Sequence, residues 1–348
     1  MGDVCDVSIR SSRPRLAQKL MAGCTPEVAA ERAGLIFSLC GKAQRVAAQA
    51  ACEAAQNVQP DAQVFAAREQ RVLIELAQEH AWQLLLNWPQ KVGRQADMPS
   101  LQRLRQSATD PLRFGETLDR LLHEVFLGEA PVIWLARDLD AFDLWRRQGT
   151  TLPAQMFGTC ADEHDRGVSH TALLPPLQHL DGTQCADLAR LALADEDFCA
   201  HPNWAGAPAE TGAIARMQDQ PLLAAWLARR GRGVGARLLA RLLELAELPQ
   251  RLRVGGSMVV KAHPLGDNAG MAAIETSRGL LIHAVRLSGN TVADYRIVAP
   301  TEWNFHPAGP LAQALVSLLK SDDALARAEE ICQSLDPCVA FGVEISNA

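Results

Sequence analysis

Two cysteines near opposite ends of the sequence have neighbours that suit metal chemistry. Cys40 lies in the run SLCGK (38–42), directly ahead of a predicted helix. Backbone N–H groups at a helix N-terminus and the adjacent lysine would lower the pKa of the Cys40 thiol and favour the thiolate, which is the form that binds metal. Cys338 follows Asp336-Pro337, where the proline fixes a turn after the last predicted helix. Read alone, either cysteine is more typical of a small buried hydrophobic side chain.

The spacing of the cysteines excludes several kinds of metal site. The sequence holds 9 cysteines but no CxxC, no CxxCH and no Cys/His quartet at zinc-finger spacing. A structural zinc ion or a covalent haem therefore has no support. An odd number of widely spread cysteines is also unlike the disulfide framework of a small secreted domain, so we expect reduced thiols. Any bound metal must take its ligands from distant parts of the chain.

Two further segments carry residues of chemical interest. Residues 160–170 gather Cys, Asp, Glu and His, but so polar a loop is typical of a solvated connection rather than of a metal site. Residues 231–235 (GRGVG) resemble a dinucleotide-binding loop, but they follow a helical pattern instead of the strand which that chemistry requires. A helix–helix turn is therefore expected there. The isolated His80, His123 and His201 are expected to have surface or core roles.

The elements that must position these residues are mainly helical. Thr25 can cap a helix and Pro26 suits its first position, which predicts a helix over 26–37. Trp88-Pro89 is expected to end a long helix that begins at residue 61. Apolar residues recurring at three-to-four spacing predict the further helices, at 42–56, 61–87, 100–126, 183–194, 219–248 and 309–334.

One region has a different pattern. From Val254 to Ala299, runs of β-forming residues separated by turn residues predict a small meander with at least one hairpin. Residues 151–182 and 199–212 are rich in Pro and Gly and are expected to be connecting loops. The chain is thus predicted to be one α+β domain over 1–348, mainly α with a small β meander. Its expected parts are a helical region, a β meander and C-terminal helices with a tail, at 1–252, 253–305 and 306–348.

Composition and charge narrow the class of protein. The chain is 48% hydrophobic and 21% charged, which is ordinary for a globular protein with a sizeable core. A formal net charge of -6 gives no basic footprint for nucleic acid, which is therefore not an expected partner. No apolar run is long enough to span a membrane, and the N-terminus lacks a secretory signal. We expect a cytoplasmic protein.

Five separated motifs occur in the order found in nickel–iron hydrogenase large subunits. ETSRG (275–279), PTEWN (300–304) and DPC (336–338) resemble E-x-x-R-G, P-[ST]-x-W-N and D-P-C-x-x-C-x-x-H of that family. FSLCG (37–41) resembles R-x-C-G-x-C, and PAETGAIAR (208–216) resembles E-x-G-P-L-A-R. The match is dense over residues 25–56 and 208–344. It implies a reduced hydrogenase large-subunit-like fold built on a central helix bundle.

The resemblance also shows what this chain lacks. In the family, four thiolates hold nickel and iron, two from each C-x-x-C, and the second of each pair bridges to iron. Here the two bridging-ligand positions are Ala43 and Phe341, and the final histidine position is Glu344. The resemblance therefore implies no bimetallic centre and no nickel. The remaining thiols of Cys40 and Cys338 suit a single low-spin iron and leave positions open for exchange.

A pocket for diatomic ligands is implied as well. Arg278 would donate charge-assisted hydrogen bonds to a cyanide nitrogen, and Thr301 would serve another ligand. The alternative role of Arg278 is a structural ion pair with Glu275 or another carboxylate. His283 and Glu344 are two further candidate metal ligands. The apolar wall around carbon monoxide corresponds to Leu281, Ala299 and Pro300.

A hydrogenase-like chain that keeps the first cysteine of each pair and lacks the second resembles the HupK/HoxV family of hydrogenase accessory proteins. This resemblance implies a scaffold, not an enzyme, that transiently holds Fe(CN)2(CO). The implied partners are HypC-type chaperones, the HypC–HypD complex and a hydrogenase large-subunit precursor. Two alternatives stay open. Ala43 and Phe341 argue against a divergent hydrogenase, and the retained Cys40, Arg278 and Cys338 argue against a metal-free structural subunit like that of respiratory complex I.

Overall fold

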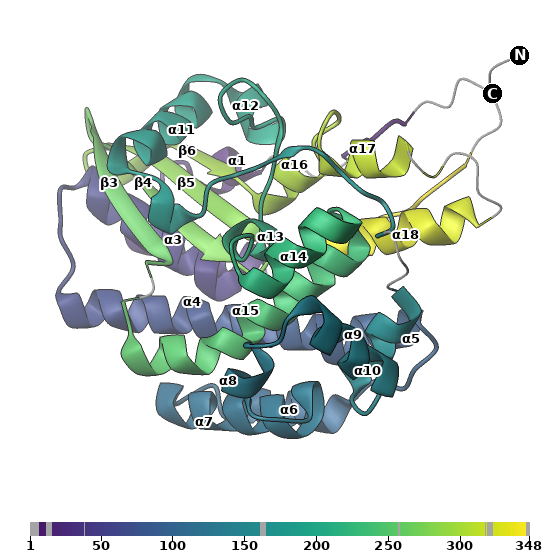
Figure 1. The fold of residues 1–348 in the computed structure, drawn as a ribbon. Helices are drawn as coiled ribbons and strands as arrows, with labels where there is room; N and C mark the ends of the chain where they lie inside the picture. The colour runs from purple at the N-terminus through teal and green to yellow at the C-terminus, as the bar shows by residue number, and fades with distance from the viewer. Residues whose placement is uncertain are drawn as a thin grey trace, which may run out of the picture.

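The chain folds around an antiparallel sheet of four strands in the order β3-β4-β5-β6, which confirms the predicted meander. Helix α3 (Gly41–Ala55) packs on one face of the sheet and α11 (Gly182–Ala194) covers the other (Figure 1). The strands are β3 (Val260–Gly266), β4 (Ala269–Thr276), β5 (Gly279–Ser288) and β6 (Thr291–Val298). The computed structural model describes residues 7–11, 16–37, 39–160, 165–256, 258–316, 318 and 323–345.

Strands β4 and β5 are buried on both faces, which explains their nearly continuous apolar sequence. Successive side chains alternate between faces, so Ala272 packs on the alanines of α3 while Met271 lies on the α11 side. Helix α3 approaches so closely that a Cβ added at Gly270 would clash with the backbone of Ala55. Small residues therefore seat α3 directly on the sheet and fix the position of Cys40, which precedes its first turn.

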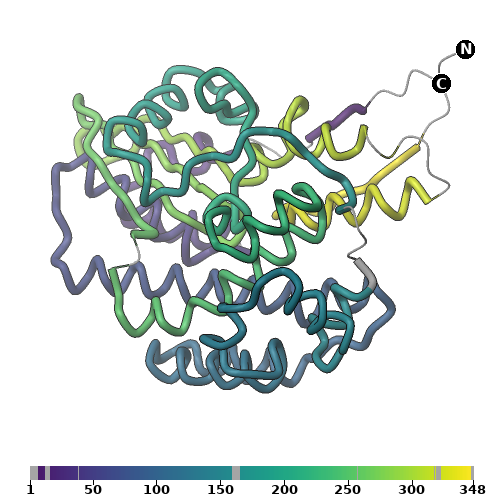
Figure 2. Tube along the Cα trace, in the orientation of Figure 1, coloured from purple at the N-terminus to yellow at the C-terminus, as the bar shows by residue number. Residues whose placement is uncertain are grey.

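A bundle of helices supports this sheet and contains most of the core. Helix α15 (Val234–Val254) is buried along almost its whole length and contacts α4 (Ala62–Trp82), α7 (Pro111–Leu121) and α18 (Ala324–Leu335). Figure 2 shows α18 (yellow) alongside α15 (green), although the two are far apart in the sequence. Leucines and aromatic residues of these helices form the largest buried cluster. The predicted class, mainly α with a small sheet, is confirmed.

The remaining elements are short and connect these two layers. A parallel pair of two-residue strands, β1 and β2, joins segments on either side of α11 and α12. Two π-helical turns, η1 and η2, continue α4 and α7, and η3 is a 3-10 turn. Their bounds, with the other helices, are α1 (Ala17–Met21), α2 (Pro26–Ile36), η1 (Gln83–Asn87), α5 (Trp88–Lys91), α6 (Met98–Gln106), η2 (Leu122–Leu127), α8 (Pro131–Trp134), α9 (Leu139–Gln148), α10 (Leu152–Cys160), β1 (Ala172–Leu173), η3 (Leu177–His179), α12 (Glu196–Ala200), β2 (Ala209–Glu210), α13 (Ala213–Arg216), α14 (Pro221–Arg230), α16 (Pro300–Asn304) and α17 (Pro310–Val316).

The helices predicted over 26–37 and 42–56 are confirmed as α2 and α3. Thr25 caps α2 as expected, because its side chain accepts a hydrogen bond from the N–H of Val28. The helix–helix turn predicted at 231–235 is also confirmed, because α14 ends directly before it and α15 begins within it. Capping residues and glycines were thus reliable signals in these segments.

Other predicted helices are wrong at their ends. The helix predicted over 100–126 divides in two, because Asp110 caps a separate helix, α7. The helix predicted over 309–334 likewise divides into α17 and α18. Trp88-Pro89 does not end a helix as predicted, and the helix that was predicted to end at residue 248 continues past it. Pro89 lies in the first turn of α5, where no N–H donor is needed, and α15 continues through Pro249 to residue 254.

The loop predicted over 151–182 is wrong in its first part, which forms α10, and it also contains β1 and η3. Helix α10 buries Ala154, Met156 and Phe157. The ring of Phe157 packs edge-on against Phe142, with ring centroids 5.2 Å apart. Tertiary packing therefore overrides a local sequence that contains proline and glycine.

Asp165 corrects the prediction that residues 160–170 form a solvated loop. Its side chain is buried and accepts hydrogen bonds from the backbone N–H groups of Gly233 (3.1 Å), Gly235 (2.8 Å) and Ala236 (2.7 Å). It also accepts one from Trp226 Nε1 at 3.0 Å. The glycine-rich turn does bind an anion at a helix N-terminus, and that anion is the chain's own carboxylate. The neighbouring positions 161–164 lie outside the described residues.

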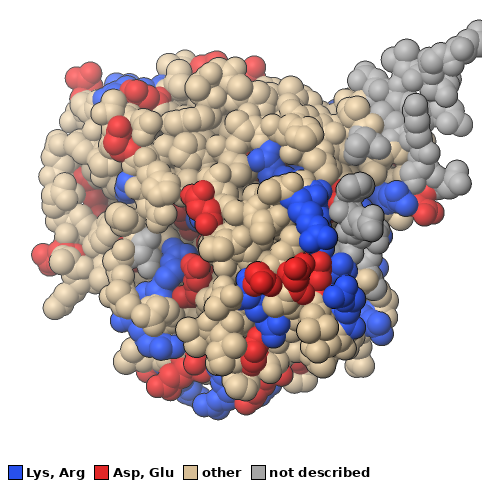
Figure 3. Space-filling model, in the orientation of Figure 1, with Lys and Arg blue, Asp and Glu red and all other residues tan. Residues whose placement is uncertain are grey.

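The surface carries charges of both signs. On the face drawn in Figure 3, basic and acidic side chains are interspersed rather than separated into large patches. Among the helices in the described part of the chain, none has both the length and the apolar character needed to cross a bilayer.

Candidate metal centre

Cys40 lies at the N-terminus of α3, as the sequence predicted, but the pKa of its thiol is not lowered. Burial and, after it, the charge on the Glu75 carboxylate raise the pKa of Cys40 to about 12. Glu75 accepts hydrogen bonds from the backbone N–H groups of Lys42 (2.7 Å) and Ala43 (3.0 Å). The positive end of the α3 dipole is therefore shared with a carboxylate, which corrects the expected thiolate in the metal-free protein.

Cys338 is held by the start of another helix. The hydroxyl of Thr301, in the first turn of α16, donates to Cys338 Sγ at 3.2 Å and accepts from the Cys338 backbone N–H at 3.4 Å. The preceding Asp336 ends α18 in a left-handed conformation with φ 54°. This turn directs the chain away from α18 and toward α16. Thr301, predicted to serve a diatomic ligand, here fixes a thiol.

Both thiols interact electrostatically with one guanidinium group. Arg278 lies in the tight turn between β4 and β5 and is buried. Burial alone would lower its pKa, but the charges of Asp336, Glu79, Cys40 and Cys338 outweigh this effect and raise it. The charge on Cys338 also raises the pKa of Cys40. Cys40, Cys338 and Arg278 are thus within electrostatic reach of one another.

Arg278 is partly neutralised by structural ion pairs, the alternative role that the sequence left open, but its partners are carboxylates other than Glu275. Its Nη2 lies 3.0 Å from Glu79 Oε2 and 3.4 Å from Asp336 Oδ1, and its Nε donates to the Asp336 carbonyl oxygen at 3.1 Å. Glu275 instead binds Arg216 at 2.7 Å. The Nη1 group of Arg278 is buried and has no hydrogen-bond partner in the described structure. A donor of this kind is costly to leave unpaired and is suited to an anionic ligand.

The residues predicted to form the apolar wall are buried. They lie on β5, which follows Arg278, and at the start of α16, which carries Thr301. Leu281 follows Arg278 on β5 and is fully buried. Ala299 and Pro300 begin α16, directly before Thr301. Leu281 also shares a buried cluster with Ala43, one of the lost bridging positions. These residues are the apolar part of the predicted centre, on β5 and α16.

His283 is wrong as a candidate metal ligand. Its ring is fully buried, Nδ1 lies 2.7 Å from the Tyr295 hydroxyl and Nε2 lies 2.8 Å from Gln44 Oε1. Because both nitrogens are engaged, neither has a lone pair to offer a metal. Burial lowers the pKa of His283 to about 3, so the ring is neutral.

Glu344 and Phe341 lie on the tail beyond Cys338 and are exposed. Phe341 therefore does not fill the space of the lost ligand, whereas Ala43 is buried. In the described ranges, no group of three or more His, Cys, Asp or Glu side chains is placed to hold a metal ion. The structure does not bring Glu344 to the cysteines, and the predicted centre depends on two thiols.

Sequence reasoning missed two carboxylates on α4. Glu75 contacts the start of α3 and Glu79 pairs with Arg278, so both face the predicted centre. Burial raises the pKa of Glu75 to about 7 and also raises that of Glu79. Their spacing of four residues places them on one side of the helix. That spacing, on a helix predicted to be amphipathic, was the available signal.

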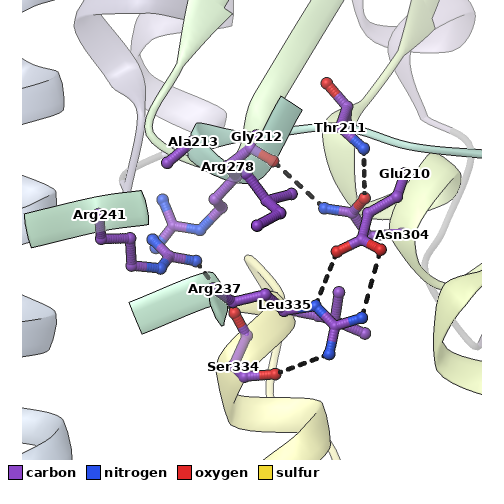
Figure 4. Close-up of a pocket in the computed structure, with 11 residues that line it drawn as sticks. Glu210, Thr211, Gly212, Ala213, Arg237, Arg241, Arg278, Asn304, Ser334 and Leu335 are labelled. Atoms are coloured by element: carbon purple, nitrogen blue, oxygen red, sulfur yellow. Dashed lines mark hydrogen bonds and ion pairs between the residues drawn. The ribbon is translucent and has the colours of Figure 1, made fainter. Parts of the chain in front are cut away.

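Buried ion pairs hold the turn that carries Arg278. Arg237 donates two hydrogen bonds to the Glu210 carboxylate, from Nε at 2.7 Å and from Nη2 at 3.2 Å (Figure 4). In the same view Asn304 donates to the Arg278 carbonyl oxygen, at 3.3 Å. Between these groups lies a cavity of about 10 Å³, which is about the least space that can hold one water molecule. The motifs around residues 210 and 304 therefore help to hold the turn that carries Arg278.

His80 belongs to a second buried network, which reaches Asp336 at the end of α18. Its Nε2 lies 2.7 Å from Glu244 Oε2, and Glu244 also binds Arg216 at 2.6 and 2.7 Å. His80 Nδ1 lies 3.5 Å from Arg241 Nη1, which binds Asp336 at 3.2 Å. His80 thus has a core role, one of the two that the sequence allowed.

The fold defines the class of protein. The [NiFeSe] hydrogenase of D. vulgaris Hildenborough aligns with a TM-score of 0.59 over 94% of this chain and 92% of that chain, at 14% identity. An NAD+-reducing [NiFe]-hydrogenase aligns with a TM-score of 0.54 over 95% and 90%, at 15% identity. The family model of the nickel-dependent hydrogenases matches residues 223–344. The chain has the fold of the hydrogenase large subunits, as the motifs predicted.

Full-length relatives narrow this class. Hydrogenase expression/formation protein HupK of Rhizobium leguminosarum bv. viciae is 32% identical over 99% of this chain and 94% of that protein. Hydrogenase expression/formation protein HoxV of Cupriavidus necator is 30% identical over 98% and 93%. The chain belongs to the HupK/HoxV family of hydrogenase expression/formation proteins.

Proposed function

We propose that this protein is a maturation scaffold that transiently binds the Fe(CN)2(CO) moiety before its transfer to a hydrogenase large subunit. Membership of a family of hydrogenase expression/formation proteins supports an accessory role. The observations that support the finer proposal are the electrostatic interaction of both Cys40 and Cys338 with Arg278 and the Nη1 group of Arg278, which is buried without a partner in the described structure. Two soft ligands and one anion-binding donor match an iron that carries cyanide.

The same site suits temporary rather than permanent binding. With a pKa of about 12, Cys40 is protonated at neutral pH, so iron must displace a proton to gain this ligand. Ala43 and Phe341 supply no further thiolate, and no nickel is expected. A site with two ligands and a competing proton releases its metal more readily than one with four thiolates.

The partners in this proposal are those implied by the resemblance to the HupK/HoxV family. HypC-type chaperones, or the HypC–HypD complex, would deliver the iron moiety, and a hydrogenase large-subunit precursor would receive it. The iron moiety is the cargo of this exchange. A metal-free structural role is the competing function, because the thiol of Cys40 is protonated without metal and no larger ligand group is present among the described residues.

Infrared spectroscopy of protein purified from a host with the iron-ligand machinery tests the proposal. We expect cyanide and carbonyl stretching bands and about one iron per chain. Cys40→Ala and Cys338→Ala should each abolish the bands. Cys185→Ala, which changes a buried cysteine on the far side of the sheet, should retain them. A wild-type protein without bands, or unchanged bands in both ligand variants, would favour the metal-free role.

A further inference from the structure

A chain of buried polar side chains ends on the sulfur of Cys40. The Tyr295 hydroxyl lies 2.7 Å from His283 Nδ1, and His283 Nε2 lies 2.8 Å from Gln44 Oε1. The Gln44 Nε2 donates to Cys40 Sγ at 3.6 Å. This relay connects β6, β5 and α3, and all three polar side chains behind Cys40 are at most 1% exposed.

Each group in the relay has one assignable role. Among the described residues, His283 Nδ1 is the hydrogen-bond partner of the buried Tyr295 hydroxyl, which must donate its proton there or leave it unpaired. His283 Nδ1 therefore accepts, Nε2 carries the ring proton, and the Gln44 carbonyl oxygen accepts from Nε2. Burial raises the pKa of Tyr295 well above its usual value, which keeps this donor protonated, and the lowered pKa of His283 keeps the ring neutral.

The relay fixes which end of the Gln44 amide faces the sulfur. A reversed amide would place its oxygen beside Cys40 and its two donors toward His283 Nε2–H, which repels them. In the observed orientation the N–H group faces Cys40, and an N–H donor stabilises a thiolate. The chain contains a single tyrosine, and it is placed where it sets this polarity.

We propose that Gln44 is a positioning residue, held in register by His283 and Tyr295, that donates a hydrogen bond to the metal-bound Cys40 thiolate. This inference deepens the proposed function and rests on it. The hydrogen bond withdraws electron density from the sulfur, so Cys40 is a weaker donor to iron. A weaker iron–sulfur bond suits a site that must release its cargo.

Nitrogen-15 NMR of the metal-free protein tests the relay without any iron. The signals of His283, assigned as those missing from His283→Gln, should show the Nε2–H tautomer and no protonation between pH 7 and about pH 5. An Nδ1–H tautomer, or titration near the usual histidine pKa, would overturn the relay.

Infrared bands of the loaded protein test the effect on Cys40. Gln44→Leu removes the donor, so the sulfur donates more electron density, and the carbonyl band should move to lower wavenumber. Tyr295→Phe should move the carbonyl band in the same direction by a smaller amount. If Gln44→Leu does not fold, Tyr295→Phe alone provides the test. Val285→Ala, a cavity variant in the cluster that contains Tyr295, should leave the band in place.

The outcomes separate the two proposals. Equal bands in wild type, Gln44→Leu and Tyr295→Phe would overturn the positioning role while the scaffold function stands. A wild type without bands would overturn the scaffold function and with it the role toward iron. The NMR result would still decide whether the relay has the stated polarity.

Discussion

The carboxylate of Glu75 accepts a 3.0 Å hydrogen bond from the backbone N–H of Ala43, the position at which hydrogenase large subunits carry a bridging cysteine. A carboxylate therefore lies next to the position where the motif resemblance implies a thiolate in those subunits. That carboxylate belongs to α4 and raises the pKa of Cys40 across the helix interface. A residue outside the cysteine motifs thus contributes to the electrostatics of the site.

Neutralising Glu75 should make Cys40 more acidic. Glu75→Gln removes the negative charge, so we expect the pKa of Cys40 to fall by about 1 unit. The pH dependence of Cys40 alkylation, followed by mass spectrometry, measures this change. The exposed Glu31→Gln is the control and should have no effect. An unchanged Cys40 pKa in Glu75→Gln would mean that burial alone is responsible.

Removing the Arg278 charge should destabilise the fold. Arg278→Met leaves the partly buried Glu79 without the arginine that binds it, and it removes one of the two arginines that bind the buried Asp336. The loss should cost about 3–5 kcal/mol of unfolding free energy. Urea denaturation measures the loss. Arg45→Met removes an exposed arginine with a 4.0 Å ion pair, and it should cost no more than about 1 kcal/mol. Similar losses in the two variants would contradict the buried role of Arg278.

Filling the contact between α3 and the sheet should also destabilise the protein. Gly270→Ala places a methyl group against the backbone at the end of α3, and overpacking of this kind costs about 1–3 kcal/mol or more. Gly342→Ala is the matched control, because nothing lies within 4 Å of a Cβ built there. Thermal unfolding compares the two. Equal melting temperatures would show that α3 can shift without cost.

Stability should fall in alkaline solution because several buried thiols favour their protonated form. Burial raises the pKa of Cys52 to about 12 and that of Cys185 and Cys332 to about 11. Below the usual thiol pKa of 9.0 this stabilisation is complete. It is lost as the pH rises above that value, because only the unfolded chain then releases these protons.

The slope of that loss can be measured residue by residue. Each thiol contributes up to about 1.4 kcal/mol per pH unit. Urea denaturation at pH 8, 9 and 10 should show a shallower decline in Cys52→Ala than in wild type. Cys24→Ala is the comparison, because Cys24 is only partly buried. Parallel declines in wild type and Cys52→Ala would contradict the protonated state of Cys52.

Local signals in the sequence were sufficient for much of the fold. Thr25 and Pro26 predicted the start of α2, and β-forming runs predicted the meander, because caps and alternating patterns act over a few residues. The order of the five motifs predicted that Cys40, Cys338 and Arg278 lie near one another, and the structure places each within the electrostatic reach of the others.

Tertiary contacts determine what the sequence could not show. The charge on Glu75 matters only because α4 places it at the start of α3. His283 was a reasonable ligand by residue type, but partners on β6 and α3 occupy both ring nitrogens. The burial of Asp165 likewise depends on a turn that follows about 70 residues later. Each of these roles needs a partner distant in sequence, which spacing does not identify.

The Asp165 carboxylate makes the chain its own ligand at the glycine-rich turn. Because it is tethered to the same molecule, it occupies the N-terminus of α15 at a very high effective concentration. A free phosphate group would have to compete with this internal anion and expose it to the core. The glycine-rich turn at 231–235 therefore resembles a nucleotide-binding loop but does not accept a nucleotide.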